Sequence, residues 1–91
     1  MKNHDQEENP FLTIMASRNL TRYDLAIICD VDYTTVCNVL QESSVCPSKK
    51  LLSGLATLGY DPASIRAQYI EFRAKTREAL LALQLEKDGV A

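Results

Sequence analysis

The 91-residue chain has little of several residue types, and each scarcity narrows the class of protein. It contains three glycines and three prolines, so long irregular loops are not expected. It contains three cysteines and one histidine, too few and too widely spaced for a disulfide framework or a zinc site. No apolar run approaches the roughly 20 residues that a membrane-spanning helix needs. We therefore expect a small globular domain that binds no metal or cofactor and does not enter a membrane.

The chain also lacks an excess of positive charge. Ten Lys and Arg residues stand against 12 Asp and Glu residues, which gives a net charge of −2. This balance excludes a strongly basic nucleic-acid coat protein, and any contact with DNA must use local charge. Residues 1–8 are polar and acidic and are predicted to form a flexible tail. Because they do not resemble a secretory signal, we expect a cytoplasmic protein.

The sequence does contain a regular series of helix signals. Asn9 before Pro10 is typical of a helix start, and Thr21 with Asp24 matches a capping box. Asp32 is expected to cap a third helix, and Asp30 suits a left-handed turn residue. Apolar residues repeat at intervals of three and four throughout, and no strand is predicted. The chain is predicted to be all-α, with five helices over about residues 10–19, 22–29, 33–41, 48–58 and 62–87.

Four segments carry a resemblance to a known family. They are LTRYDLA at 20–26, DVDYTTV at 30–36, Pro-Ser at 47–48 and Leu-Gly at 58–59. In this order and spacing they resemble the Cro and phage-repressor family, also called the XRE family. The resemblance covers about residues 9–65. It implies a five-helix Cro/phage-repressor-like helix-turn-helix domain at residues 9–61, extended by a long C-terminal helix at 62–87.

The resemblance implies a sequence-specific transcription regulator, a repressor, that binds double-stranded DNA with helix 33–41 in the major groove. The apolar side of that helix contains Val36, Val39 and Leu40, which leaves the opposite side free to read bases. On that side Asn38 suits pairing with adenine, and the resemblance implies three base contacts, namely Tyr33, Thr34 and Asn38. It also implies phosphate contacts near helix N-termini, from Arg22, Ser44, Ser48, Lys49 and Lys50.

Some residues depart from the family pattern. Asp30 occupies a position where the family usually has glycine, and Asp32 adds a second carboxylate beside the recognition helix. Over residues 11–60 four basic residues are balanced by four acidic ones. The three base-contact candidates could also form the solvated surface of a helix, but the helix-turn-helix context favours groove contact. A solvated surface explains the Lys49-Lys50 pair almost as well as a phosphate contact does. No cationic neighbour of Cys37 is evident in the sequence, so a reactive thiol there is not expected.

The last helix is about twice as long as a domain of this size needs to close its core. Its apolar residues repeat four and three apart, which is typical of a coiled-coil seam. We therefore predict a homodimer, joined through Tyr69, Phe72, Thr76, Leu80 and Leu83. A dimer also fits the two-fold half-sites that helix-turn-helix proteins commonly read.

A second interpretation belongs to another functional class. The same fold could bind and modulate another regulator, as an antirepressor or an antitoxin-like partner does. The acidic composition favours it, as do the apolar residues expected at the surface, Ile27, Ile28 and the C-terminal helix. An enzyme is not expected, because the sequence has no usable Cys/His pair, glycine-rich phosphate loop or carboxylate cluster.

Overall fold

The helix caps expected from the sequence fix the start of α1 and α2. α1 (Pro10–Arg18) follows Asn9, whose Oδ1 accepts a 3.0 Å hydrogen bond from the Phe11 N–H. α2 (Arg22–Cys29) begins with a complete capping box, in which Thr21 and Asp24 exchange bonds of 2.9 and 3.1 Å. Both predicted starts are confirmed. Each cap satisfies N–H groups that would otherwise have no partner.

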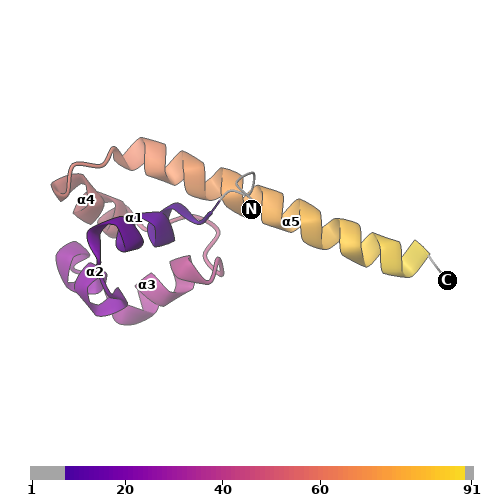
Figure 1. Cartoon of the computed structure of the whole chain (residues 1–91), viewed down its shortest axis with the longest axis horizontal. Coiled ribbons are helices and arrows are strands. Elements are labelled where there is room, and N and C mark those ends of the chain that lie inside the picture. Colours follow the sequence, from indigo (N-terminus) through magenta and orange to yellow (C-terminus); the bar gives the residue numbers. More distant parts are fainter. Residues whose placement is uncertain (1–7, 90–91) are drawn as a thin grey trace.

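The next two helices begin differently from each other. α3 (Tyr33–Leu40) follows Asp32 as predicted, but the Asp32 carboxylate makes no capping hydrogen bond, so its predicted capping role is wrong. α4 (Lys49–Thr57) follows Ser48, whose Oγ accepts from the Leu51 N–H at 3.1 Å. α5 (Pro62–Gly89) completes the set. The computed structural model describes residues 8–89, and these form five helices and no strand, which confirms an all-α fold (Figure 1).

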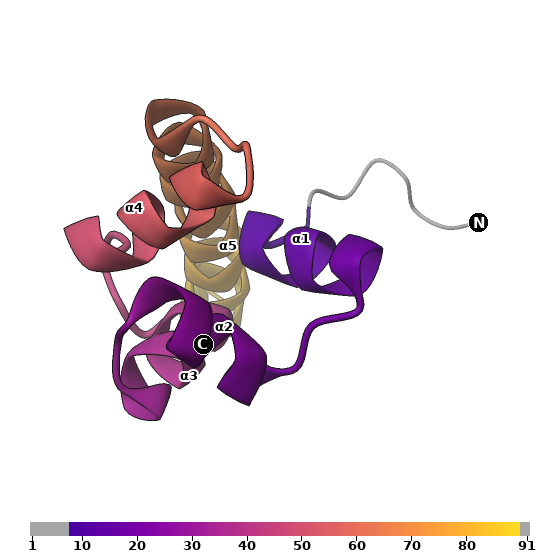
Figure 2. The same ribbon diagram turned by 90° about the vertical axis from the view of Figure 1, so that its left-hand side faces the viewer.

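The core lies where α1 to α4 meet the first turns of α5. In Figure 2, which looks nearly along α5, α1 lies on one side of that helix and α4 on the other. The largest fully buried side chains are Phe11, Leu25, Val36, Leu51, Leu55 and Tyr69. Ile65 and Tyr69 of α5 belong to this same cluster. The core therefore crosses the boundary at residue 61 that the sequence predicts.

Tyr69 corrects the predicted dimer seam. Its side chain has no exposed surface, its ring packs edge-on against Phe11 with centroids 5.8 Å apart, and its hydroxyl donates to the Ser44 carbonyl at 2.7 Å. A residue enclosed by its own domain cannot contact a second copy. The seven-residue apolar pattern of α5 indicates which positions are buried. At Tyr69 the burial is within one chain and not between two chains.

Beyond the domain, α5 continues as a single helix into solvent. The molecule measures 50 × 29 × 22 Å, and Figure 1 shows α5 running well past the other helices. Exposed leucines lie on this projecting part, namely Leu80, Leu81, Leu83 and Leu85. Within residues 8–89, no helix is both long enough and apolar enough to cross a membrane. The predicted flexible tail lies outside the described residues except for Glu8, which accepts from the Thr13 hydroxyl at 3.1 Å.

Candidate nucleic-acid interface

A tight turn of three residues joins α2 to α3. Asp30 adopts the left-handed conformation, with φ 56° and ψ 49°, as the sequence predicts. The N–H groups of Asp30 and Val31 donate to the Ile27 and Ala26 carbonyls at 3.2 and 3.0 Å. An aspartate thus ends α2 in the conformation that glycine most often provides. The turn fixes the position of α3 relative to α2.

α3 has one buried and one exposed face. Val36, Val39 and Leu40 are buried in the core. Thr34 and Asn38 are exposed, and lie one helical turn apart at the centre of the outward face. Tyr33 is 39% exposed. The predicted outward orientation of these three residues is confirmed.

The first turn of α2 contacts one edge of the outward face of α3. The Tyr23 and Tyr33 rings stack with centroids 4.5 Å apart and planes 22° apart. Arg22 Nη1 donates to Cys37 Sγ at 3.7 Å, and this hydrogen bond, with a second to Tyr33, raises the pKa of the Arg22 guanidinium. Cys37 therefore does have a cationic neighbour, contrary to the expectation from sequence. We call the Tyr23–Tyr33 stack and the Arg22–Cys37 hydrogen bond the α2–α3 contacts.

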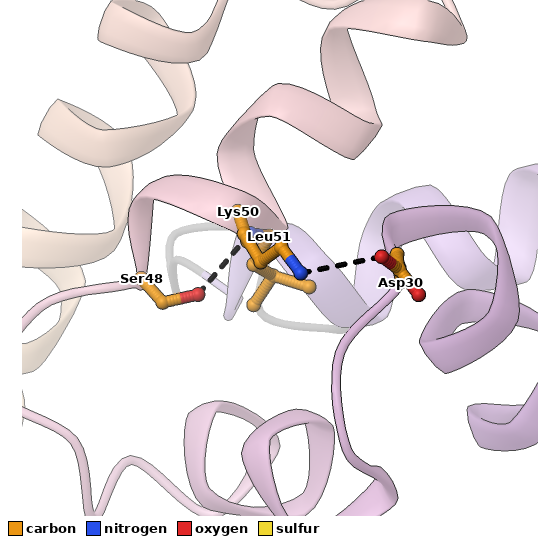
Figure 3. Close-up of polar contacts among 4 residues, drawn as sticks. All are labelled: Asp30, Ser48, Lys50 and Leu51. Carbon is orange, nitrogen blue, oxygen red and sulfur yellow. Dashed lines mark hydrogen bonds and ion pairs between the residues drawn. The ribbon is translucent and has the colours of Figure 1, made fainter.

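The start of α4 lies beside the other edge of the outward face of α3. The turn at Asp30–Asp32, the Thr35 side chain and the first turn of α4 line a hollow of about 570 Å³. Lys50 Nζ lies 3.2 Å from Asp30 Oδ2 (Figure 3), and both side chains are mostly exposed. Ser48 Oγ accepts from Leu51 N–H in the same view and keeps its own proton to donate. Three predicted phosphate contacts, Ser48, Lys49 and Lys50, thus share one edge of this hollow.

Most of the hydrogen-bonding groups of the Asn38 side chain remain available to solvent. The Ser43 hydroxyl donates to the Asn38 carbonyl at 3.1 Å and lies 3.4 Å from its Oδ1. The Asn38 side-chain amide donates to no group within residues 8–89. An exposed amide with a free NH₂ group and a remaining oxygen lone pair can still make the two bonds that adenine offers in the major groove.

The loop that contains Ser44 is attached to α5. The Ser44 carbonyl accepts from Tyr69, and the Glu42 carbonyl accepts from Arg73 Nε at 2.9 Å. Ser44 itself is half-buried. Ser44 is the predicted phosphate contact whose position is fixed by α5. The other predicted phosphate contacts lie at the start of a helix.

Two residues of this surface were missed from sequence. Tyr23 supports the Tyr33 ring, and Thr35 lines the hollow beside α4. A tyrosine in the first turn of each of two successive helices was the available signal for the stack. Whether the two tyrosine rings meet depends on the angle between α2 and α3, which the sequence pattern does not provide.

Comparison with known proteins found no match for this chain. No protein-family model matches the chain. No curated protein matches it, and no solved structure does.

Proposed function

We propose that the protein is a sequence-specific DNA-binding transcription regulator, a repressor, which acts as a dimer. In this proposal α2 and α3 form a Cro/phage-repressor-like helix-turn-helix, and α3 enters the major groove. One observation carries it: the exposed face of α3, with Thr34 and Asn38 at its centre, has Arg22 of α2 on one side and the Lys49-Lys50 pair of α4 on the other. An eight-residue helix is about 12 Å long, which fits within the B-DNA major groove.

The side chains on α3 suit base edges. Asn38 can accept from adenine N6 and donate to N7, and Thr34 can contact a thymine methyl group or a phosphate. The Tyr33 hydroxyl can donate to a phosphate oxygen or to an acceptor on a base edge. Stacking against Tyr23 limits the rotamers open to Tyr33, so less conformational entropy is lost when it binds.

The flanks of α3 suit the phosphate backbone. Arg22 is exposed on α2, and Lys49 is exposed at the start of α4, where free backbone N–H groups also favour an anion. Asp30 offsets part of the Lys50 charge. With few uncompensated cations, we expect weak binding to non-specific DNA and a shallow dependence of affinity on salt.

Selection from random duplex DNA tests the proposal. The protein is expected to enrich one motif at low salt, and Asn38→Ala is expected to weaken binding to that motif by about 1–3 kcal/mol and to relax preference at one base pair. Gln68→Ala, an exposed amide on α5, is the matched control and leaves affinity unchanged. No enriched motif, or an unchanged preference in Asn38→Ala, would contradict the assignment of α3.

Exposed isoleucines on α2 favour a second candidate function, the binding of another regulator. Ile27 is 78% exposed and Ile28 is 36% exposed, on the side of α2 away from the core. In this alternative, Ile27→Asp abolishes a stable complex with a protein partner that forms without DNA. Under the DNA-reading proposal the same variant leaves the selected motif unchanged.

A further inference from the structure

The turn between α2 and α3 fixes a negative charge at the edge of the hollow beside α4. Asp30 has φ 56° and ψ 49°, and its N–H donates to the Ile27 carbonyl at 3.2 Å, so the end of α2 sets its backbone position. Its side chain is short, whereas that of Lys50 is long and flexible. Lys50 Nζ reaches Asp30 Oδ2 at 3.2 Å (Figure 3). Asp30 is therefore the fixed member of this ion pair, and Lys50 is the mobile one.

The carboxylate of Asp30 is not needed for the turn itself. The hydrogen bonds that close the turn come from the backbone N–H groups of Asp30 and Val31. Within residues 8–89, the Asp30 carboxylate bonds to Lys50 and to no other group. Glycine or asparagine would also suit the left-handed conformation. What aspartate adds at this position is its charge.

Two further charged side chains line the same hollow. Lys49 and Asp32 lie at its edge, and neither makes an ion pair within residues 8–89. The hollow thus contains one paired cation, Lys50, and one unpaired cation, Lys49. Asp30 and Asp32 are in the same way one paired and one unpaired carboxylate.

A paired cation and an unpaired cation differ in how far they attract DNA. The field of a single charge extends over a Debye length, about 8 Å at physiological salt. At that range the fields of Lys50 and Asp30 nearly cancel, because the two groups are 3.2 Å apart. They do not cancel at hydrogen-bonding distance. The Lys50 ammonium has three N–H donors and uses one on Asp30, so it can still bind a phosphate that enters the hollow.

We propose that Asp30 is a specificity-determining residue, which lets Lys50 attract a phosphate only in the close complex formed on the preferred DNA sequence. The inference rests on the proposed function. Non-specific binding depends almost entirely on attraction to the phosphate backbone, and loosely bound DNA gains little from a cation whose charge is cancelled. When α3 enters the groove fully, a phosphate reaches the hollow and Lys50 contacts it. Asp30 thus weakens binding to other sequences more than binding to the preferred one.

Asp30→Asn tests this role, because asparagine has nearly the same shape, tolerates the left-handed conformation and carries no charge. Binding to random-sequence duplex DNA and to the enriched motif is measured at several salt concentrations. Affinity for random duplex is expected to rise about tenfold at low salt, and its logarithmic salt dependence to steepen by about 0.9 per subunit in contact. Affinity for the motif is expected to change by less than about twofold. An equal change on both DNAs, or no change on either, would overturn the proposal.

A second variant shows whether Asp30 acts through Lys50. Adding Lys50→Ala to Asp30→Asn removes the cation that the first substitution frees. The double variant is therefore expected to bind random duplex about as weakly as the wild type does. Random-duplex binding as tight as that of Asp30→Asn alone would contradict the pairing.

Two control variants separate pairing from charge alone. Asp32→Asn removes an unpaired carboxylate from the same hollow, and is expected to raise both affinities by similar factors because that charge repels phosphate at every distance. Glu71→Gln removes the same charge from the exposed Glu71–Lys75 pair of α5, and is expected to leave both affinities nearly unchanged. If either control lowered the ratio of motif to random-duplex affinity as far as Asp30→Asn does, the role assigned to Asp30 would be wrong.

The two proposals can fail separately. If the wild type enriches a motif but Asp30→Asn leaves the ratio of the two affinities unchanged, the DNA-reading function stands and the role of Asp30 is wrong. If neither the wild type nor Asp30→Asn enriches a motif, the proposed function is wrong, and Asp30 has no preferred site to distinguish.

Discussion

At the scale of single residues, Tyr69 links the C-terminal helix to the rest of the domain. Its ring contacts Phe11, and its hydroxyl donates to the Ser44 carbonyl at 2.7 Å. Burial raises the pKa of the Tyr69 hydroxyl above the ordinary value of 10.0. The neutral phenol is therefore the form that the folded protein favours.

This shift predicts how stability depends on pH. Above pH 10 the unfolded chain loses the Tyr69 proton while the folded chain keeps it, so the free energy of unfolding falls as pH rises, by up to about 1.4 kcal/mol per pH unit. Tyr69→Phe is expected to fall less steeply there, and to be about 1 kcal/mol less stable at neutral pH because the Ser44 carbonyl loses its donor. Urea unfolding of both proteins between pH 7 and 11 measures this. Equal slopes would contradict the assignment.

At the scale of elements, α2 and α4 approach each other closely at Gly54. A Cβ added there would overlap the Cα and Sγ atoms of buried Cys29. The burial that raises the pKa of the Cys29 thiol reflects the same close packing. The distance between these helices in turn sets where Lys49 and Lys50 lie relative to α3.

Gly54→Ala is therefore expected to destabilise the protein, although alanine favours helix. The overlap with Cys29 forces α4 to shift, at a cost of about 1–3 kcal/mol in the free energy of unfolding. Ser53→Ala, at the neighbouring exposed position of α4, is the control and is expected to be neutral or slightly stabilising. Thermal unfolding of both variants distinguishes these outcomes, and a stabilised Gly54→Ala would contradict the close approach.

The elements themselves were largely predictable from sequence. Asn9 and Thr21 are local caps, and the apolar spacing of α3 correctly identifies its outward residues. The α2–α3 contacts were not predictable, because they join residues 10 and 15 positions apart through a helix crossing. Tyr69 was misassigned because a periodic apolar pattern does not distinguish burial within a chain from burial between chains.

At the scale of the whole molecule, the proposed dimer depends on the exposed leucines of the projecting part of α5, residues 77–87. Leu83→Glu is expected to dissociate the dimer, because it places a carboxylate in the apolar seam. Leu85→Glu is the matched control, since Leu85 is 67% exposed on another side of α5 and is expected to leave the dimer intact. Sedimentation at several protein concentrations measures both. A dimer in Leu83→Glu would place the contact elsewhere on the molecule.

The two attachments of the α3–α4 loop to α5 have a mechanical consequence. Tyr69 holds the Ser44 carbonyl and Arg73 holds the Glu42 carbonyl, directly after the end of α3. These two attachments restrict bending between α3 and α5. We therefore expect a displacement of α5 relative to the domain to move the end of α3 with it.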